Sequence, residues 1–306
     1  MLAGLLVLSM VLWIATPHFL TASNLLNVAE QSAIVGVVAV GMTFVILTGG
    51  IDLSVGSLVA LSGIVFGLAL RSGAPVLGAT LLGLASGTLC GVANGAMVTL
   101  GRLPPFIATL GMMSVARGAA LMLADGRPIS GFPEAFRLLA TGKIFGVPVP
   151  AVLMIAAYAA AHLVLSRTVL GRYTYAIGGN EEAARLSGVN IRRIKITNYA
   201  ISGFCSALTS LLLVARLNSA QPIAGMSYEL DAIAAVVIGG TSLLGGTGSI
   251  VGTLIGALIM AVLRNGLNLL GVSSYVQQIA IGTVIVAAVL IDMTLRRRAL
   301  AGTGNA

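Results

Sequence analysis

Charged residues are scarce in this chain. Only 8% of its 306 residues are Asp, Glu, Lys or Arg, whereas a soluble domain carries about 25%. So few charges cannot cover a water-exposed surface, and this excludes an ordinary soluble enzyme. Cysteine is also sparse: Cys90 and Cys205 stand singly in apolar runs, which is typical of small buried residues and not of metal sites or disulfides.

Motifs for nucleotide and metal chemistry are absent from the sequence. The two lysines, Lys143 and Lys195, are each followed by isoleucine, so the chain has no Gly-x4-Gly-Lys-Ser/Thr phosphate loop and cannot hydrolyse ATP by that route. The two histidines, His18 and His162, are far apart and belong to no His-Glu-x-x-His pattern. We therefore expect no catalytic residue, metal or cofactor in this chain.

Long apolar runs dominate what is present: 58% of the residues are hydrophobic, and the mean hydropathy is +1.04. A transmembrane helix needs about 20 mostly apolar residues. The runs lie near 1–16, 33–48, 54–70, 76–98, 105–123, 149–166, 196–215, 230–245, 249–266 and 275–292. They predict an all-α integral membrane protein of about ten transmembrane helices, in one membrane domain over 1–306. Several runs are short, which allows one pair to be re-entrant or broken.

Basic residues predict the orientation. They concentrate in the loop 167–195 and at 296–298, and the positive-inside rule places both in the cytoplasm. Loops 124–148 and 216–229 are then external, and both chain ends are cytoplasmic. The net charge of +8 lies between apolar runs, so we interpret it as a topology signal and expect lipid, not nucleic acid, around the chain.

Three short matches suggest an internal duplication. They occur in the same order: 33–38 with 232–237, 49–58 with 245–254, and Asn94-Gly95 with Asn265-Gly266. Repeats of this kind are common in transporters. The ten-span arrangement, however, puts the two Asn-Gly pairs on opposite sides of the membrane.

A very short helix is predicted within 178–188. Asn180 is a good N-cap, Glu181 and Glu182 suit the first turn, and Gly188 suits a C-terminal stop. A helix of about seven residues is unstable alone in water, so it must dock onto something. That surface is either this protein's own cytoplasmic face or a partner.

The segment 49–57 carries the only acid deep in the N-terminal half, Asp52. A charge at the bilayer centre costs about 2.5–3.5 kcal/mol on insertion scales. One interpretation is a cap, in which Gly49 and Gly50 end one helix and Asp52 or Ser54 starts the next. The other is a pore-lining break, and the two are compatible.

Amide side chains in the apolar runs are a third candidate feature. They are Asn94, Asn265, Asn268, Gln277 and Gln278. A transport pathway for an uncharged cargo with hydroxyl groups needs sparse hydrogen-bonding groups of this kind, but amides also join helices to one another. The pathway candidates are Gly49, Gly50, Asp52, Ser54, Ser57, Asn94, Asn265 and Asn268. Arg117 and Arg264 either snorkel to an interface or form ion pairs.

Motifs throughout the chain resemble those of the ribose-type monosaccharide permeases of ABC importers. The resemblance rests on segments 41–57, 170–173, 178–191, 220–222, 228–236, 239–242 and 265–272. In such permeases a short cytoplasmic helix with Ala-Ala and a glycine meets the ATPase subunit. The resemblance assigns that coupling role to Gly179, Asn180, Glu181, Glu182, Ala183, Ala184, Arg185, Leu186 and Gly188.

The resemblance also implies partners and a location. We expect a multi-pass permease of the bacterial cytoplasmic (inner) membrane, paired with a second copy, two ATPase subunits that hold ATP and Mg, and a sugar-delivering binding protein. Gln221 and Glu229, in the external loop, are candidates for contact with the binding protein, unless this is a plain solvated loop. The expected cargo is ribose. The alternatives are another small neutral cargo (xylose, galactose or an autoinducer-type furanose) or an ion-coupled secondary transporter.

Overall fold

The computed structural model describes the backbone of residues 1–303 and the side chains up to 287, with that of 290. The predicted cytoplasmic arginines at 296–298 lie outside the described side chains. Over the described backbone the chain forms thirteen helices and four two-residue strands, which confirms the all-α membrane architecture.

Helices of two lengths make up the apolar part of the fold. Within the described residues, six are long and apolar enough to cross a membrane: α2 (Ala22–Leu47), α4 (Val76–Thr99), α5 (Pro105–Leu123), α7 (Val149–Arg167), α10 (Ile191–Leu217) and α12 (Ile250–Leu269). The shorter apolar ones are α1 (Leu2–Ala15), α3 (Val55–Arg71) and the start of α13 (Ser274–Thr303), and α11 (Tyr228–Ile238) is shorter still. The remaining helices are α6 (Glu134–Thr141), α8 (Val169–Gly179) and α9 (Glu181–Leu186).

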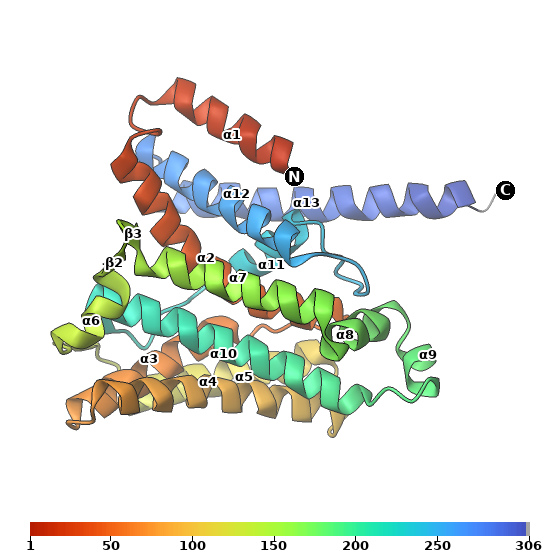
Figure 1. Cartoon of the computed structure of the whole chain (residues 1–306), viewed down its shortest axis with the longest axis horizontal. Coiled ribbons are helices and arrows are strands. Elements are labelled where there is room, and N and C mark those ends of the chain that lie inside the picture. Colours follow the sequence, from red (N-terminus) through yellow and green to blue (C-terminus); the bar gives the residue numbers. More distant parts are fainter. Residues whose placement is uncertain (304–306) are drawn as a thin grey trace.

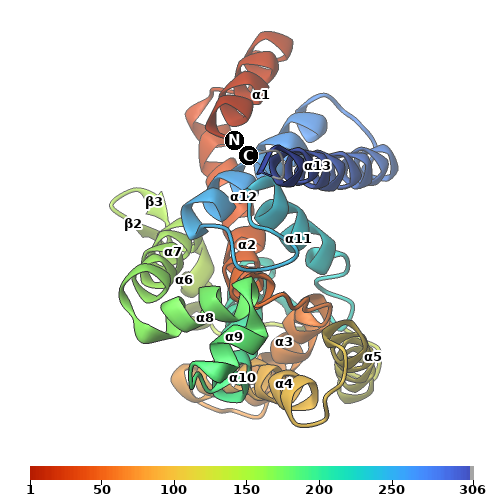
Figure 2. The ribbon, with the colours of Figure 1, turned by 90° about the vertical axis from the view of Figure 1, so that its right-hand side faces the viewer.

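Helix α2 lies at the centre of the molecule, between α11 and α12 on one side and α3 and α10 on the other (Figure 2). It begins eleven residues before the apolar run at 33–48, because Thr21 caps it by accepting a hydrogen bond from the Asn24 amide at 3.3 Å. Its polar first turns find partners on neighbouring helices: Glu30 pairs with Arg216 at 3.4 Å.

One apolar run is helical over only part of its length, and another begins directly after a non-helical segment. The run near 230–245 contains α11, which has 11 residues and is therefore roughly 16 Å long, about half of a bilayer core. The chain then leaves the helix, and Gly240, Gly245 and Gly246 all adopt positive φ. Helix α3 is likewise preceded by a non-helical segment, 48–54. The fold thus contains two interrupted spans.

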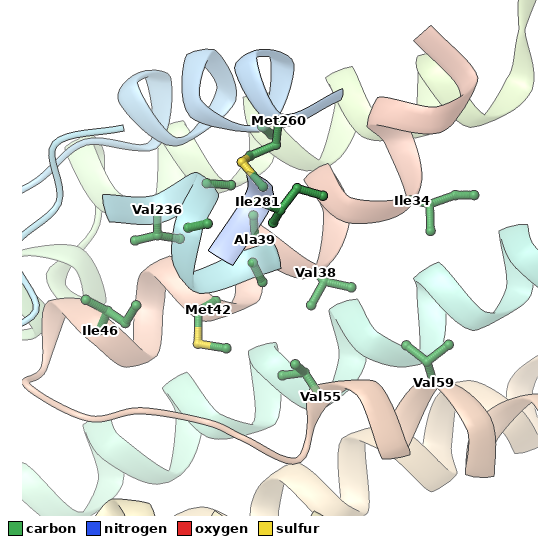
Figure 3. Packing of buried hydrophobic residues seen from close by; sticks show 14 of the residues in the cluster. Ile34, Val38, Ala39, Met42, Ile46, Val55, Val59, Val236, Met260 and Ile281 are labelled. Atoms are coloured by element: carbon green, nitrogen blue, oxygen red, sulfur yellow. The ribbon is translucent and has the colours of Figure 1, made fainter. Parts of the chain in front are cut away.

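Apolar side chains from these elements form the core. Figure 3 shows Ile34, Val38, Ala39, Met42 and Ile46 of α2 meeting side chains of α3, α11, α12 and α13. Most of this cluster is shielded from solvent, and its small residues let α2 and α11 approach closely. Both interrupted spans are therefore anchored on the same central helix.

The two ends of the molecule differ in structure. At one end lie α6 and two antiparallel pairs, β1 (Ile129–Ser130) with β4 (Ser219–Ala220) and β2 (Lys143–Ile144) with β3 (Val147–Pro148). At the opposite end lie α8 and α9, and α13 runs toward that end (Figure 1). The predicted external and cytoplasmic loops thus lie at opposite ends.

Two of the three internal matches occupy equivalent places in the structure. Residues 33–38 and 232–237 precede the two breaks, and the second match covers each break and the start of the following helix. The Asn-Gly pairs do not correspond, because Asn94 lies in the second helix after its break and Asn265 in the first. The observed order supports a duplication of helix, break and helix only.

Candidate functional site

The short helix predicted within 178–188 is confirmed as α9. Asn180 caps it, with its Oδ1 accepting from the Ala183 amide at 2.9 Å. Gly188, at φ +83°, ends the turn that follows. Two acids stand in the first turn, where Glu181 pairs with Lys195 at 2.6 Å. Local sequence signals were sufficient here because every cap is made within the segment itself.

One side of α9 packs on its own chain and the other is open. Ala184 is buried against Ile177 of α8 and Ile194 of α10. Leu186, in contrast, is 80% exposed. Glu182 and Arg185 form an exposed pair at 2.6 Å, which raises the pKa of the Arg185 guanidinium. The predicted candidates Gly179, Glu181 and Ala183 are exposed as well. The face of α9 opposite Ala184 is therefore exposed.

Helix α8 connects α9 to both interrupted spans. Gly178, next to its last residue, lies against the carbonyl of Leu47 at the end of α2 and against Gly246 in the second break. The Gly246 amide donates to the Leu47 carbonyl at 3.0 Å, and the Tyr175 hydroxyl donates to the Gly248 carbonyl at 3.0 Å. We call this contact of α2, α8 and the segment 239–249 the glycine junction.

Asp52 is fully buried at the first break and is surrounded by hydroxyl and amide groups. Its Oδ1 accepts from the amide and hydroxyl of Ser54 at 3.0 and 2.6 Å, and its Oδ2 accepts from the Ser202 hydroxyl at 2.8 Å. Asn94 of α4 donates to the Ser54 hydroxyl at 2.8 Å. Helix α3 begins after Ser54, but no side chain caps its first turn, so the capping interpretation of Asp52 and Ser54 is not confirmed. Nearby, Gly50 is buried beside Tyr199.

The two asparagines of α12 have different surroundings. Asn265 is buried and exchanges two side-chain hydrogen bonds with Asn24 of α2, at 2.8 and 3.0 Å, which is the helix-joining role. Asn268 is exposed and accepts from Gln277 of α13 at 2.7 Å. It lines a cavity of about 450 Å³ between α11, α12 and α13.

The two candidates for contact with a binding protein, Gln221 and Glu229, have different surroundings in the structure. Gln221 is exposed, whereas Glu229 belongs to the first turn of α11. Glu229 lines a cavity of about 310 Å³ together with Ser57 and Arg117. Arg117 holds the non-helical approach to α11 by donating to two backbone carbonyls, those of Pro222 and Ala224, at 2.8 Å each. Gly49, at φ +72°, lies at the glycine junction.

Of the two roles expected for Arg264, snorkelling or an ion pair, the structure shows the ion pair. Its Nη2 lies 2.9 Å from both carboxylate oxygens of Asp231. This pair joins α12 to α11 across 33 positions of sequence and borders two cavities. The described residues contain no group of three or more His, Cys, Asp or Glu side chains that could hold a metal ion.

Comparison with known proteins places this architecture in a family. Residues 24–289 match the family described as "Branched-chain amino acid transport system / permease component". The chain belongs to this family of permease components. The match includes both interrupted spans and α9, and no solved structure matches the chain.

Several curated permeases are similar over most of their length. The ribose import permease protein of Bacillus subtilis (strain 168) is 52% identical over 292 residues, 94% of this chain and 90% of the relative. The D-allose transport system permease protein of Escherichia coli (strain K12) is 38% identical over 281 residues, 92% and 86% of the two chains. The fructose import permease protein of Rhizobium meliloti is 39% identical over 292 residues, 91% and 80%.

One feature of the permease was missed from the sequence. The pairing of Asp231 with Arg264 was not predicted, because the sequence places Asp231 among the polar residues of the external segment around Pro222. Its partner, Arg264, stands alone among apolar residues in α12. An acid and an arginine in two membrane segments are a signal for pairing, but the sequence gives no distance between them.

Proposed function

We propose that this permease is the membrane subunit of an ATP-driven importer and that its cargo is ribose. The similarity to a ribose import permease, at 52% identity, exceeds that to the allose and fructose permeases, at 38% and 39%. The scarcity of charge in the spans suits a neutral cargo. Other neutral sugars remain the competing cargoes to be tested.

The proposed arrangement has ten spans in the cytoplasmic membrane, with both chain ends in the cytoplasm. The six long helices, the three shorter apolar ones and α11 supply the ten. The non-helical segments 48–54 and 239–249 would complete the two interrupted spans. The arrangement is supported by the basic segment 167–195, which lies at the end toward which α13 runs (Figure 1).

The observation that carries the proposal is the exposed face of α9. This helix is anchored through Ala184 and fixed by Asn180, yet it presents Leu186 to solvent. An apolar side chain held on a rigid charged helix is suited to a socket on a partner. We assign that partner as the ATPase subunit, which would hold ATP and Mg, with a second permease copy completing the pathway and a binding protein delivering sugar near Gln221.

Co-purification tests the assignment. The permease, carrying Leu186→Glu or no change, is expressed with its ATPase and purified in detergent. We expect wild type to retain the ATPase and Leu186→Glu to lose it with an unchanged melting profile, because the side chain has few contacts of its own. Leu138→Glu in α6, 52% exposed at the opposite end of the molecule, is the matched control and should retain the ATPase.

A transport assay distinguishes ATP hydrolysis from an ion gradient as the energy source. Wild-type complex in proteoliposomes, with binding protein, should take up labelled ribose only when ATP is present. Uptake driven by an ion gradient without any ATPase would establish the secondary-transporter alternative and overturn the proposal. Competition by unlabelled allose, fructose, xylose or galactose identifies the cargo.

A further inference from the structure

A charged pair lies within the apolar part of the molecule. Asp231 is only 3% exposed, and Arg264 reaches it from the fifteenth residue of the twenty-residue helix α12. Ionisable groups at such positions are costly in a membrane, and they typically face a cavity and mark a transport pathway. This pair follows that pattern, since the Arg264 side chain keeps 38% of its surface accessible.

The accessible side of the pair opens into a cavity of about 450 Å³. Small-molecule sites typically enclose about 300–1,000 Å³. Its polar lining consists of Ser227, Asp231, Arg264, Asn268, Ser274, Gln277 and Gln278. A smaller cavity of about 130 Å³ shares Asp231 and Arg264 on the other side. An ion pair with a purely structural role would be expected to be enclosed by packed side chains, but this one separates two hollows.

The chemistry of the lining matches a neutral polyol. A carboxylate accepts from two hydroxyl groups, a guanidinium donates to hydroxyl and ring oxygens, and amides do both. Gln277 is held in place because its Nε2 donates to the Asn268 Oδ1 at 2.7 Å and to the Val272 carbonyl at 2.9 Å. Its own Oε1 therefore has a fixed position for accepting a hydrogen bond. Met226 and Ile281 add apolar surface for the carbon face of a ring.

The cavity also lies at the N-terminal end of α11, the end away from the break at 239–249. Met226 and Ser227, just before α11, line both this cavity and the 310 Å³ cavity that contains Ser57, Arg117 and Glu229. The positive end of the α11 dipole is therefore bordered by two polar hollows. Interrupted helices in transporters commonly end at substrate sites in this way.

We propose that the cavity around Asp231 and Arg264 is the site at which the permease binds its monosaccharide during translocation. Asp231, Arg264 and Asn268 are its hydrogen-bonding partners. This assignment deepens the proposed sugar-import function and rests on it. The occupant is the free sugar, after its release from the binding protein.

Cysteine protection tests the site directly. Cys90 and Cys205 are replaced by serine, and a single cysteine is introduced on the exposed rim of the cavity as Gln278→Cys, with Ser274→Cys as a second reporter. The permease–ATPase complex in nanodiscs is treated with N-ethylmaleimide over a series of D-ribose concentrations. We expect D-ribose to slow labelling saturably, by roughly tenfold when about nine-tenths of the sites are occupied, and we expect no slowing with L-ribose.

The matched control is Ile279→Cys, which lies on α13 but does not line the cavity. Its labelling should not respond to either sugar. A second measurement uses the double variant Asp231→Asn, Arg264→Gln, which removes both charges and keeps hydrogen-bonding groups. A site role predicts that ribose uptake falls roughly tenfold while the melting temperature and the bound ATPase are unchanged, whereas a structural pair predicts that uptake and melting temperature fall together.

The outcomes separate this inference from the proposed function. If wild type imports ribose, but D-ribose protects neither reporter and the double variant transports normally, the site assignment is wrong and the import function stands. If wild type imports no ribose with ATP and binding protein, the proposed function fails, and the site assignment fails with it.

Discussion

The glycine junction predicts opposite behaviour for two adjacent glycines of α8. An added Cβ at Gly178 would collide with the Leu47 carbonyl and the Gly246 amide, whereas an added Cβ at Gly179 would meet nothing within 4 Å. Neither residue has a positive φ, so alanine is sterically acceptable to the backbone at both. The pair Gly178→Ala and Gly179→Ala therefore isolates the effect of the contact.

The magnitude follows from three contributions. Overpacking at a tight contact costs about 1–3 kcal/mol, and weakening the Gly246–Leu47 hydrogen bond costs about 0.5–1.5 kcal/mol more. Replacing a helical glycine by alanine stabilises the folded state by up to about 1 kcal/mol. We expect Gly178→Ala to be destabilised by about 1–3 kcal/mol, and Gly179→Ala to be neutral or stabilised by up to about 1 kcal/mol.

Thermal unfolding in detergent measures the stability difference, at about 2–4 °C for each kcal/mol. Transport measures its consequence. Since the exposed face of α9 is unchanged, both variants should bind the ATPase, but Gly178→Ala should import less sugar per ATP hydrolysed. Equal melting temperatures and equal transport in the two variants would refute the idea that this junction connects α9 to the interrupted spans.

Two further substitutions test the polar contacts that hold the interrupted spans. Ser202→Ala removes a hydrogen bond to the buried Asp52 carboxyl and should lower stability by about 1–3 kcal/mol; a melting temperature equal to that of wild type would contradict the network. Arg117→Leu frees the carbonyls of Pro222 and Ala224 and should accelerate amide hydrogen exchange over 221–227; unchanged exchange would show that Arg117 does not hold this segment.

The sequence predicted those features that depend on neighbouring residues. The caps and turns of α9 are an example, because Asn180 and Gly188 act within a few positions of their partners. The apolar runs likewise predicted the helices, although not their ends: the polar residues of α2 before position 33 concealed its first three turns. Periodicity and hydropathy do not report where a helix with an apolar continuation stops, which is why the early end of α11 at Ile238 was missed.

Pairings between distant segments could not be predicted. Asn24 meets Asn265 across 241 positions, and Asp52 meets Ser202 across 150. Each residue alone fits a pathway role or a helix-joining role, and only the three-dimensional arrangement assigns a partner. The pathway candidates therefore fall into two groups. Asp52, Ser54 and Asn94 are fully buried among other side chains, whereas Asn268 lines a cavity.

Helix α11 connects the glycine junction at α8 to the cavity around Asp231. Its C-terminal end continues into the segment 239–249, which contacts α8 at Gly178 and Tyr175. Its N-terminal end, roughly 16 Å away, carries Asp231 and borders the cavity. A short helix without internal breaks is stiff, so a displacement of α8 that reaches the junction must also move the Asp231 end or break the Gly246–Leu47 hydrogen bond. Because the N-terminal end of α11 borders the cavity, that movement changes the shape of the polar site as well as the tilt of the helix.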